Sequence, residues 1–442
     1  MGQKFFLTTY GCQMNKLDSE LVASRLVQAG YGRAESEAAA SVLLINTCSV
    51  REHAEDRVWS RLGRLRLRKE SEPGLIIGVL GCMAQEHKVA IRTRMPHVDL
   101  VCGTGEFGDI ARMLERIRGR REALVATGGG SGGDEVPRNV RLRPSRSQAF
   151  VNIIRGCNMP CTFCVVPATR GSEVCRPVDA ILDEVERLVE DGVSQITLLG
   201  QTVNAYGHGL GPGVNLAFLL GRLHEIHRLR RISFVTSHPN YLSAELMETM
   251  ARLPRVSRYL HLPAQSGSNA VLARMQRCYT VERYRSRVDR LRGLVPEMEL
   301  ASDFIAGFPG ETEEDHRASL RLLEAMRFSQ CFVFSYSPRP GTGSGDHLAD
   351  DVPAEVKARR HRELLAVQER ISLEKNRELI GSVTEVLVEG PSKIRADRYS
   401  GRTSRQRLVH FPNQDPSFVG RYLPVRVSAA GPYSLIGEPL GS

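Results

Sequence analysis

The feature of this sequence that most constrains its fold is a repeated alternation of short apolar runs with longer amphipathic stretches. Over the first 120 residues the apolar runs predict strands at 4–9, 41–46, 74–80 and 98–101, and the amphipathic stretches predict helices at 16–29, 51–69, 84–94 and 105–119. Because strands that alternate with helices form parallel sheets covered by helices, this part predicts a small doubly wound α/β domain.

The alternation resumes further along the chain, with predicted strands at 149–154, 194–199, 231–236, 257–262, 299–306 and 330–336. These βα units predict a partial (β/α)6 barrel, and the chemistry of such barrels lies at the carboxyl ends of the strands. A long polar helix is predicted at 353–378. The mixed α/β pattern therefore contains a second, larger domain.

The last part of the chain changes to period-two segments at 382–389, 405–410 and 420–428, broken by Gly, Pro and Asn. This pattern predicts a small all-β barrel. Residues 127–147 are rich in Gly, Pro and charge and are predicted to be a linker. We therefore expect domains at 1–126, 148–378 and 379–442.

The composition fits ordinary globular domains, with 442 residues, 41% hydrophobic and 25% charged, and excludes collagen, a coiled-coil rod and wholesale disorder. No run approaches the roughly 20 apolar residues of a membrane span, and the start lacks a signal peptide. We expect a cytoplasmic monomer with no membrane partner, whose cysteines stay reduced. The net charge of +10 favours a polyanionic partner and leaves RNA, DNA and acidic proteins open.

The sharpest local signal is Cys157, Cys161 and Cys164 in a Cys-x-x-x-Cys-x-x-Cys arrangement after the first strand of the predicted barrel. Three thiolates can hold an iron–sulfur cluster and leave one iron free for a cofactor or substrate. A structural zinc loop is the alternative, but it needs a fourth ligand, and no Cys or His follows at a fitting spacing. This stretch resembles the cluster-binding loop of radical S-adenosylmethionine (SAM) enzymes.

A second set consists of Cys12, Cys48 and Cys82, each of which follows the end of a successive predicted strand. All three are expected at one sheet edge, where open α/β sheets bind ligands, and there they could hold a second cluster. The alternative is that they are small buried apolar residues. Cys102 ends a strand at the same edge and could be a fourth ligand or a packing residue.

Both cysteine sets, with the stretches TTYGCQMNKLDSE, NTCSVRE and GVLGCMAQ, resemble the tRNA methylthiotransferase family in its MiaB branch. The resemblance continues through VVPATRG, LLGQTVNAYG, HLPAQSGS and SDFIAGFPGET to LVEGPSK and SGRT, so it covers nearly the whole chain. It implies a radical SAM enzyme that adds a methylthio group to carbon 2 of an isopentenylated adenosine beside the tRNA anticodon.

The resemblance also implies cofactors and roles. Two 4Fe-4S clusters are expected, with Cys157, Cys161 and Cys164 holding the SAM-binding cluster and Cys12, Cys48 and Cys82 an auxiliary one. Residues from about 381 would form a TRAM domain, an RNA-binding barrel. The implied partners are tRNA bearing isopentenyladenosine, an electron donor such as a flavodoxin or ferredoxin, and a sulfur donor.

Polar groups at or just beyond the barrel strand ends are the candidate contacts for SAM, because strand ends form the site in such barrels. They are Gly200, Gln201, Asn204, Ser237, Gln265 and Asp303, with His238 as a further candidate. Arg170 could pair with a carboxylate or with RNA. In the tail we expect RNA backbone contacts from arginines near the aromatic residues Tyr399 and Phe411, namely Arg395, Arg398, Arg402, Arg405 and Arg407.

Two other functions remain open at this point. The same chemistry could act on a threonylcarbamoyl-modified adenosine in tRNA or on a ribosomal protein, although the GCQMN and NTCSVRE stretches favour the isopentenyl branch. A non-catalytic iron–sulfur or zinc RNA-binding protein, with both cysteine sets purely structural, belongs to a different class. Release of 5'-deoxyadenosine that depends on a reductant would distinguish an enzyme from such a protein.

Overall fold

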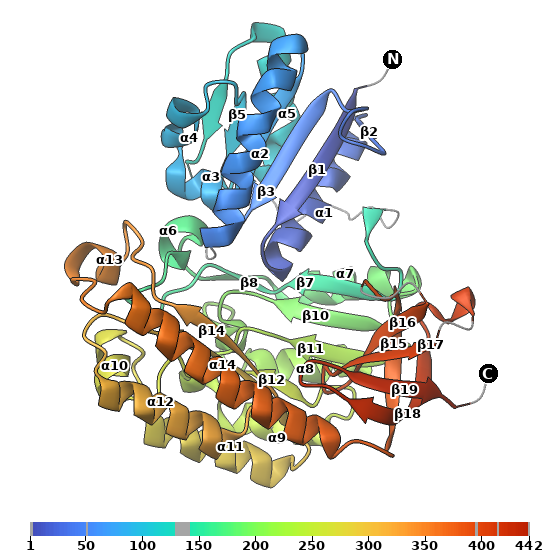
Figure 1. The fold of residues 1–442 in the computed structure, drawn as a ribbon. Helices are drawn as coiled ribbons and strands as arrows, with labels where there is room; N and C mark the ends of the chain where they lie inside the picture. The colour runs from blue at the N-terminus through green and yellow to red at the C-terminus, as the bar shows by residue number, and fades with distance from the viewer. Residues whose placement is uncertain (1–2, 50–51, 129–141, 394–396, 413–414, 441–442) are drawn as a thin grey trace. The chain divides into compact units, whose positions relative to one another are not determined.

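A computed structural model describes residues 3–49, 52–128, 142–393, 397–412 and 415–440. The chain divides into two compact units (Figure 1). Unit 1 consists of Met1–Pro144, Arg155–Asn158 and Val165–Glu173, and unit 2 consists of Ser145–Ile154, Met159–Cys164 and Val174–Ser442. Most of the predicted linker at 127–147 lies outside the described residues.

Unit 1 is built on a six-stranded parallel sheet with the order β2-β1-β3-β4-β5-β6. Its strands are β1 (Lys4–Tyr10), β2 (Gly32–Arg33), β3 (Val42–Thr47), β4 (Ile76–Gly81), β5 (Leu100–Cys102) and β6 (Leu124–Ala126). Strands β3 and β4 are buried along their whole length, as expected for the centre of a parallel sheet.

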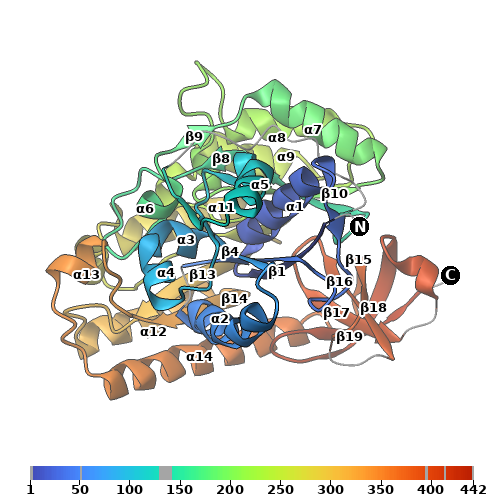
Figure 2. The same cartoon turned by 90° about the horizontal axis from the view of Figure 1, so that it is seen from above.

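Helices cover both faces of this sheet (Figure 2). On one face lie α1 (Gln13–Gln28) and α5 (Ile110–Arg120), and on the other lie α2 (Glu52–Ser71), α3 (Cys82–His87) and α4 (Val89–Arg94). The predicted doubly wound domain is therefore confirmed. The single helix predicted over 84–94 is wrong, because Lys88 has a φ of 47° and ends one helix before the next begins.

Unit 2 contains six parallel strands in two three-stranded sheets, β11-β10-β7 and β12-β13-β14. They are β7 (Gln148–Asn152), β10 (Gln195–Leu199), β11 (Arg231–Phe234), β12 (Tyr259–His261), β13 (Glu299–Ala306) and β14 (Gln330–Ser335). Pairing between the two sheets is reduced to a single bridge from Ile232 to Val256. The expected partial barrel is confirmed.

Helices and two short strands complete the chain before its last strands; of these, residues 155 and 166–170 belong to unit 1 and the rest to unit 2. They are β8 (Ile154–Arg155), α6 (Val166–Arg170), β9 (Val174–Cys175), α7 (Val178–Glu190), α8 (Leu216–Glu225), α9 (Ala244–Arg252), α10 (Asn269–Arg274), α11 (Val281–Leu294), α12 (Glu313–Met326), α13 (Gly343–His347) and α14 (Ala354–Arg377). Helix α14 is the long polar helix expected at 353–378.

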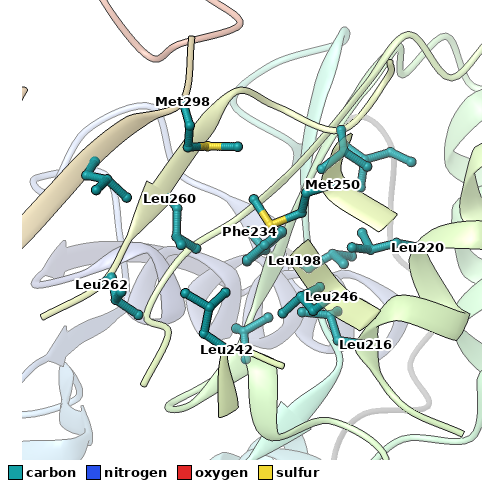
Figure 3. Close-up of a cluster of buried hydrophobic side chains, with 14 of the residues drawn as sticks. Leu198, Leu216, Leu220, Phe234, Leu242, Leu246, Met250, Leu260, Leu262 and Met298 are labelled. Carbon is teal, nitrogen blue, oxygen red and sulfur yellow. The ribbon is translucent and has the colours of Figure 1, made fainter. Parts of the chain in front are cut away.

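The core of the barrel lies between its strands and the surrounding helices. Figure 3 shows Phe234 and Leu260 from the strands gathered with Leu216, Leu246 and Met250 from the helices, and all of these side chains are buried. Each such side chain contributes roughly 1.5–3 kcal/mol on burial. This packing holds the strand ends in place.

The last strands form a closed barrel with the order β15-β16-β17-β19-β18. They are β15 (Val383–Pro391), β16 (Arg398–Thr403), β17 (Leu408–Pro412), β18 (Tyr422–Ala430) and β19 (Leu435–Pro439). The predicted all-β barrel is confirmed, although the sequence pattern missed β16 and β19. Among the described residues, none of the helices has the length and apolar character needed to cross a membrane.

Candidate metal centres and cofactor site

Three cysteines of unit 1 follow neighbouring strands of the parallel sheet. The register pairs Tyr10 with Thr47 and Thr47 with Gly81, so the chain leaves β1, β3 and β4 at the same level. Cys12 caps the amino terminus of α1, Cys48 follows β3, and Cys82 begins α3. The structure therefore brings this predicted set to one sheet edge.

Two glycines allow these turns to approach one another closely. At Gly11, with a φ of 138°, an added Cβ would lie 2.6 Å from Cβ of Cys48. At Gly81, with a φ of 93°, it would lie 2.3 Å from Oδ1 of Asn46 and 2.7 Å from the carbonyl oxygen of Thr47. Because only glycine combines a positive φ with this little space, both positions require it.

Buried amides tie the beginning of α1 to β3. Asn15 Oδ1 accepts hydrogen bonds from the Cys12 backbone N–H at 3.3 Å and from the Cys12 thiol at 3.2 Å. Asn46 Nδ2 donates to the Asn15 carbonyl and to Ser19 Oγ, each at 2.9 Å. These bonds fix Cys12 against the strand that precedes Cys48. Sequence reasoning missed Asn15 and Asn46 as support residues, and their only signal was their position next to the cysteine motifs.

A buried ion pair lies near the thiols of Cys12 and Cys82. Arg170 Nη2 is 2.7 Å from Asp18 Oδ2, and their side chains are 3% and 2% exposed. This contact decides the question that the sequence left open, because Arg170 pairs with a carboxylate. A hydrogen bond with Cys48 lowers the pKa of Cys12 to about 6, and the charge of Arg170 acts in the same direction. Burial raises the pKa of Cys82, and the charge of Arg170 opposes that increase.

The donor set fits an iron–sulfur cluster better than a single ion. Four sulfur ligands about 2.3 Å from one zinc ion lie roughly 3.8 Å apart. Among the described residues, the only trio of possible ligand atoms that all lie within 4.8 Å of one another is that of Glu55, Glu86 and His87, so at least one pair of the three sulfur atoms lies farther apart than zinc requires. Thiols at the edge of a sheet, with a buried guanidinium nearby, suit the larger, negatively charged site of a cluster.

Cys102 has a packing role. Its side chain is fully buried among the apolar residues of β1, β3, α1 and α5, and burial raises its pKa. Its thiol donates to the Gly103 carbonyl at 3.7 Å. Of the two roles left open by the sequence, the structure supports packing.

The second cysteine motif is held by contacts within each unit. In unit 1, the Cys157 N–H donates to the Gly171 carbonyl at 3.2 Å. In unit 2, the Cys164 N–H donates to the Cys161 carbonyl at 3.1 Å, and Thr162 Oγ1 donates to the Arg274 carbonyl at 2.9 Å. All three motif cysteines are partly exposed, in contrast to Cys48 and Cys82. The motif is thus a constrained loop with accessible thiols, as a cluster with an open iron requires.

The candidate SAM contacts lie at or just after the ends of the barrel strands. The amide of Asn204 donates to the His238 carbonyl at 2.9 Å and accepts from the His238 N–H at 2.8 Å, and Asp303 Oδ1 is 3.0 Å from His261 Nε2. Gly200 directly follows β10, and an added Cβ would lie 2.3 Å from the Ile154 side chain. Gln201, next along the chain, is half-buried.

Two of these candidates carry polar atoms that a ligand would satisfy. Ser237 Oγ and Gln265 Oε1 are buried and have no hydrogen-bond partner among the described residues. Gln265 also has a φ of 68°, in the left-handed region. His238 Nδ1 accepts from the Asn240 N–H, which leaves Nε2 to carry the ring proton, and this atom too is buried without a partner in the described chain. Unsatisfied polar groups at strand ends fit a polar cofactor.

The tail residues differ in part from the expectation. Tyr399 and Phe411 are buried and pack edge to face in the barrel core, so their rings are not available for contact with RNA. Arg407 is also buried, with Nη2 3.1 Å from Glu299 Oε1. Its burial contradicts the expected contact with RNA. Arg398, Arg402 and Arg405 are partly exposed, and Arg395 lies outside the described residues.

Comparisons with known proteins cover nearly the whole chain. Residues 4–103 match the uncharacterized protein family UPF0004, residues 151–323 the radical SAM superfamily, and residues 377–440 the TRAM domain. A tRNA-2-methylthio-N(6)-dimethylallyladenosine synthase of Rhodopirellula baltica is 44% identical, with 99% of this chain and 96% of that protein covered. One of Moorella thermoacetica is 43% identical, with 98% of each covered.

Solved structures share the fold at low sequence identity. The radical SAM methyltransferase TsrM from Kitasatospora setae matches with a TM-score of 0.56 and 15% identity, over 78% of this chain and 75% of that one. The cobalamin-dependent SAM radical enzyme OxsB matches with a TM-score of 0.53 and 15% identity, over 85% of this chain and 56% of that one.

Proposed function

Because the chain belongs to the family of tRNA-2-methylthio-N(6)-dimethylallyladenosine synthases, we propose that it adds a methylthio group to carbon 2 of the isopentenylated adenosine beside the tRNA anticodon. The observation that carries the proposal is the pairing of two cysteine sets, one at the edge of the unit 1 sheet and one after the first barrel strand. It is a radical SAM enzyme with a TRAM domain.

We assign the two cysteine sets to the two clusters of the enzyme. Cys157, Cys161 and Cys164 would hold the SAM-binding 4Fe-4S cluster, and Cys12, Cys48 and Cys82 would hold the auxiliary one. Together with SAM, these clusters would supply the electron, the radical and the sulfur, because an unactivated aromatic C–H bond offers nothing for an acid or a base to act on. Two triads that each leave one iron without a protein ligand suit this division of labour.

The residues of the chain would bind and orient. Ser237 and Gln265, with their unsatisfied polar atoms, are the best-supported SAM contacts, and Gly200, Gln201, Asn204 and Asp303 are proposed to line the same strand ends. Gly200 has little space for a side chain, so its role would be close approach of the backbone to the cofactor. The apolar core behind these residues keeps them rigid, which lowers the cost of orienting a substrate.

The partners follow from the chemistry. The tRNA would be bound by its phosphates, and the partly exposed Arg398, Arg402 and Arg405 are the candidate contacts on the TRAM barrel. A one-electron donor such as a flavodoxin or ferredoxin would reduce the first cluster, and a separate sulfur donor would supply the auxiliary one. We place the enzyme in the cytoplasm, where thiols stay reduced, and propose that it acts as a monomer.

Two triple variants test the assignment after anaerobic reconstitution. Replacing Cys157, Cys161 and Cys164 by alanine should abolish the release of 5'-deoxyadenosine. Replacing Cys12, Cys48 and Cys82 should preserve that release but abolish methylthiolated tRNA, measured by mass spectrometry of nucleosides. Cys278→Ala removes an exposed, lone cysteine and is the matched control, with no expected effect. Release of 5'-deoxyadenosine by the first variant would refute the assignment.

A further inference from the structure

Arg277 lies beside one thiol of the motif in the second unit. Its Nη1 is 3.1 Å from Cys161 Sγ, and the side chain is almost completely buried. Its other donors are directed at Tyr279 Oη, at 3.3 Å from Nε, and at the Pro263 carbonyl, at 3.4 Å from Nη2. Each of the three guanidinium nitrogens therefore has a hydrogen-bond partner, and one of these partners is the Cys161 sulfur.

The backbone around Arg277 is held in an unusual conformation. The residues on both sides, Gln276 and Cys278, are left-handed, with φ values of 52° and 59°. Each such residue costs on the order of 1 kcal/mol or more and persists only where surrounding contacts enforce it. Here the Arg277 N–H donates to the Leu272 carbonyl at 3.0 Å, and Tyr279 Oη donates to the Ala264 carbonyl at 2.8 Å. The loop is thus built to present this arginine.

The charge of Arg277 has no carboxylate partner. Within the described part of the chain, no Asp or Glu oxygen lies within the 4.0 Å of an ion pair with it. The nearby His238 is neutral, because burial and the charge of Arg277 lower its pKa to about 2. A buried cation is costly unless an anion compensates it. Among the described residues, the Cys161 sulfur, 3.1 Å from Nη1, is the neighbour of this cation that becomes anionic when it ligates a metal.

We propose that Arg277 is a positioning residue that fixes Cys161 as a thiolate ligand and raises the reduction potential of the SAM-binding cluster. This inference rests on the proposed function, which assigns Cys161 to that cluster. Reduction adds one electron from the external low-potential donor and makes the site more negative, while the guanidinium stays protonated. A fixed positive charge hydrogen-bonded to a ligating sulfur stabilises the reduced state.

The test measures the potential directly. In the Cys12, Cys48 and Cys82 triple alanine background only the SAM-binding cluster remains, and its potential is read from a redox titration followed by electron paramagnetic resonance. Arg277→Gln should shift the potential to a more negative value, and Arg277→Lys, which keeps the charge, should show a smaller shift. Arg255→Gln is the matched control, because Arg255 donates to the carbonyls of His224 and Ile226 and contacts no cysteine.

The outcomes separate this inference from the proposed function. If the parent binds no iron through Cys157, Cys161 and Cys164, the proposed function fails. If the parent holds the cluster and Arg277→Gln leaves its potential unchanged, the inference about Arg277 is overturned. Should Arg277→Gln not retain iron, Tyr279→Phe gives the answer by removing the hydroxyl that orients Nε. A smaller negative shift is then expected, and no shift contradicts the proposal.

Discussion

Each of the two cysteine sites has one buried arginine beside it, but the two arginines differ in their counter-charge. Arg170 in unit 1 forms an ion pair with Asp18, whereas Arg277 in unit 2 is directed at the Cys161 thiol, at the Tyr279 hydroxyl and at a carbonyl. The Asp18 carboxylate already compensates the positive charge of Arg170, so this charge has less effect on a cluster that binds nearby. Arg277 has the Cys161 sulfur beside it in place of a carboxylate, so the positive charge of Arg277 acts on whatever that sulfur binds.

The two sites also differ in exposure. In unit 1 Cys48 and Cys82 are buried and only Cys12 is partly exposed, while Cys157, Cys161 and Cys164 are all partly exposed. A SAM-binding cluster exchanges electrons and cosubstrate in every cycle, which requires access, whereas a sulfur-carrying site gains from exclusion of water. The comparison suggests that unit 1 is built to protect its site and unit 2 to tune and expose its own.

The largest expected effect comes from removing the carboxylate partner of Arg170, so that Arg170, like Arg277, has no carboxylate beside it. Asp18→Asn leaves a buried guanidinium without its carboxylate, which should cost about 3–5 kcal/mol of unfolding free energy. The measurement is denaturant unfolding of the metal-free protein, followed by the fluorescence of Trp59, the only tryptophan, which lies on α2 of unit 1. The loss should be smaller after reconstitution, because thiolates then compensate the cation.

Two controls make this result specific. Glu70→Gln removes an exposed partner of Arg66, an ion pair 3.5 Å long, and should cost less than about 1 kcal/mol. The double variant Asp18→Leu with Arg170→Met removes both charges and should stay close to the parent. An equal loss in Asp18→Asn and Glu70→Gln would show that the buried pair has no special role.

The next effect tests whether close packing stabilises the turns that carry Cys12, Cys48 and Cys82, the proposed auxiliary site. Gly81→Ala places a Cβ against Asn46 and the Thr47 carbonyl at a φ of 93°, and it should cost about 2–3 kcal/mol through strain and displacement. Gly63→Ala in the middle of α2 meets open space and should stabilise by about 0.5–1 kcal/mol. Denaturant unfolding followed by the fluorescence of Trp59 measures the stability of both variants. A neutral Gly81→Ala would contradict the packing argument.

The sequence predicted the features that depend on local pattern, such as the strand ends that carry the cysteines. It missed the features that depend on residues distant in the chain, such as the burial of the arginines. Cys12, Cys48 and Cys82 could be placed at one edge because parallel strands end at the same side of a sheet. Arg407 was assigned to RNA because basic residues are normally exposed, but Glu299, more than 100 positions away, binds it in the interior. Nothing in the local sequence around Arg277 indicated that its side chain is buried beside Cys161. Burial of polar groups is decided by tertiary contacts, which local pattern does not record.

The smallest effect extends the comparison to a buried arginine with a carboxylate partner and no metal site nearby. Burial alone would raise the pKa of Glu299, but the charges of Arg407 and Lys375, each 3.1 Å away, outweigh it and lower that pKa. A pKa lowered by folding contributes stability above the unfolded value of about 4.3, and that stability is lost as the pH falls through the folded value.

We therefore expect the parent to lose on the order of 1 kcal/mol more stability than Glu299→Gln between neutral pH and about pH 3, measured by calorimetric melting. Glu385→Gln is the matched control, because Glu385 pairs with Arg230 between the same two barrels but is about half exposed. It should leave the pH dependence of the parent unchanged. If Glu299→Gln also keeps that dependence, folding does not lower the pKa of Glu299, and the comparison does not extend to this ion pair.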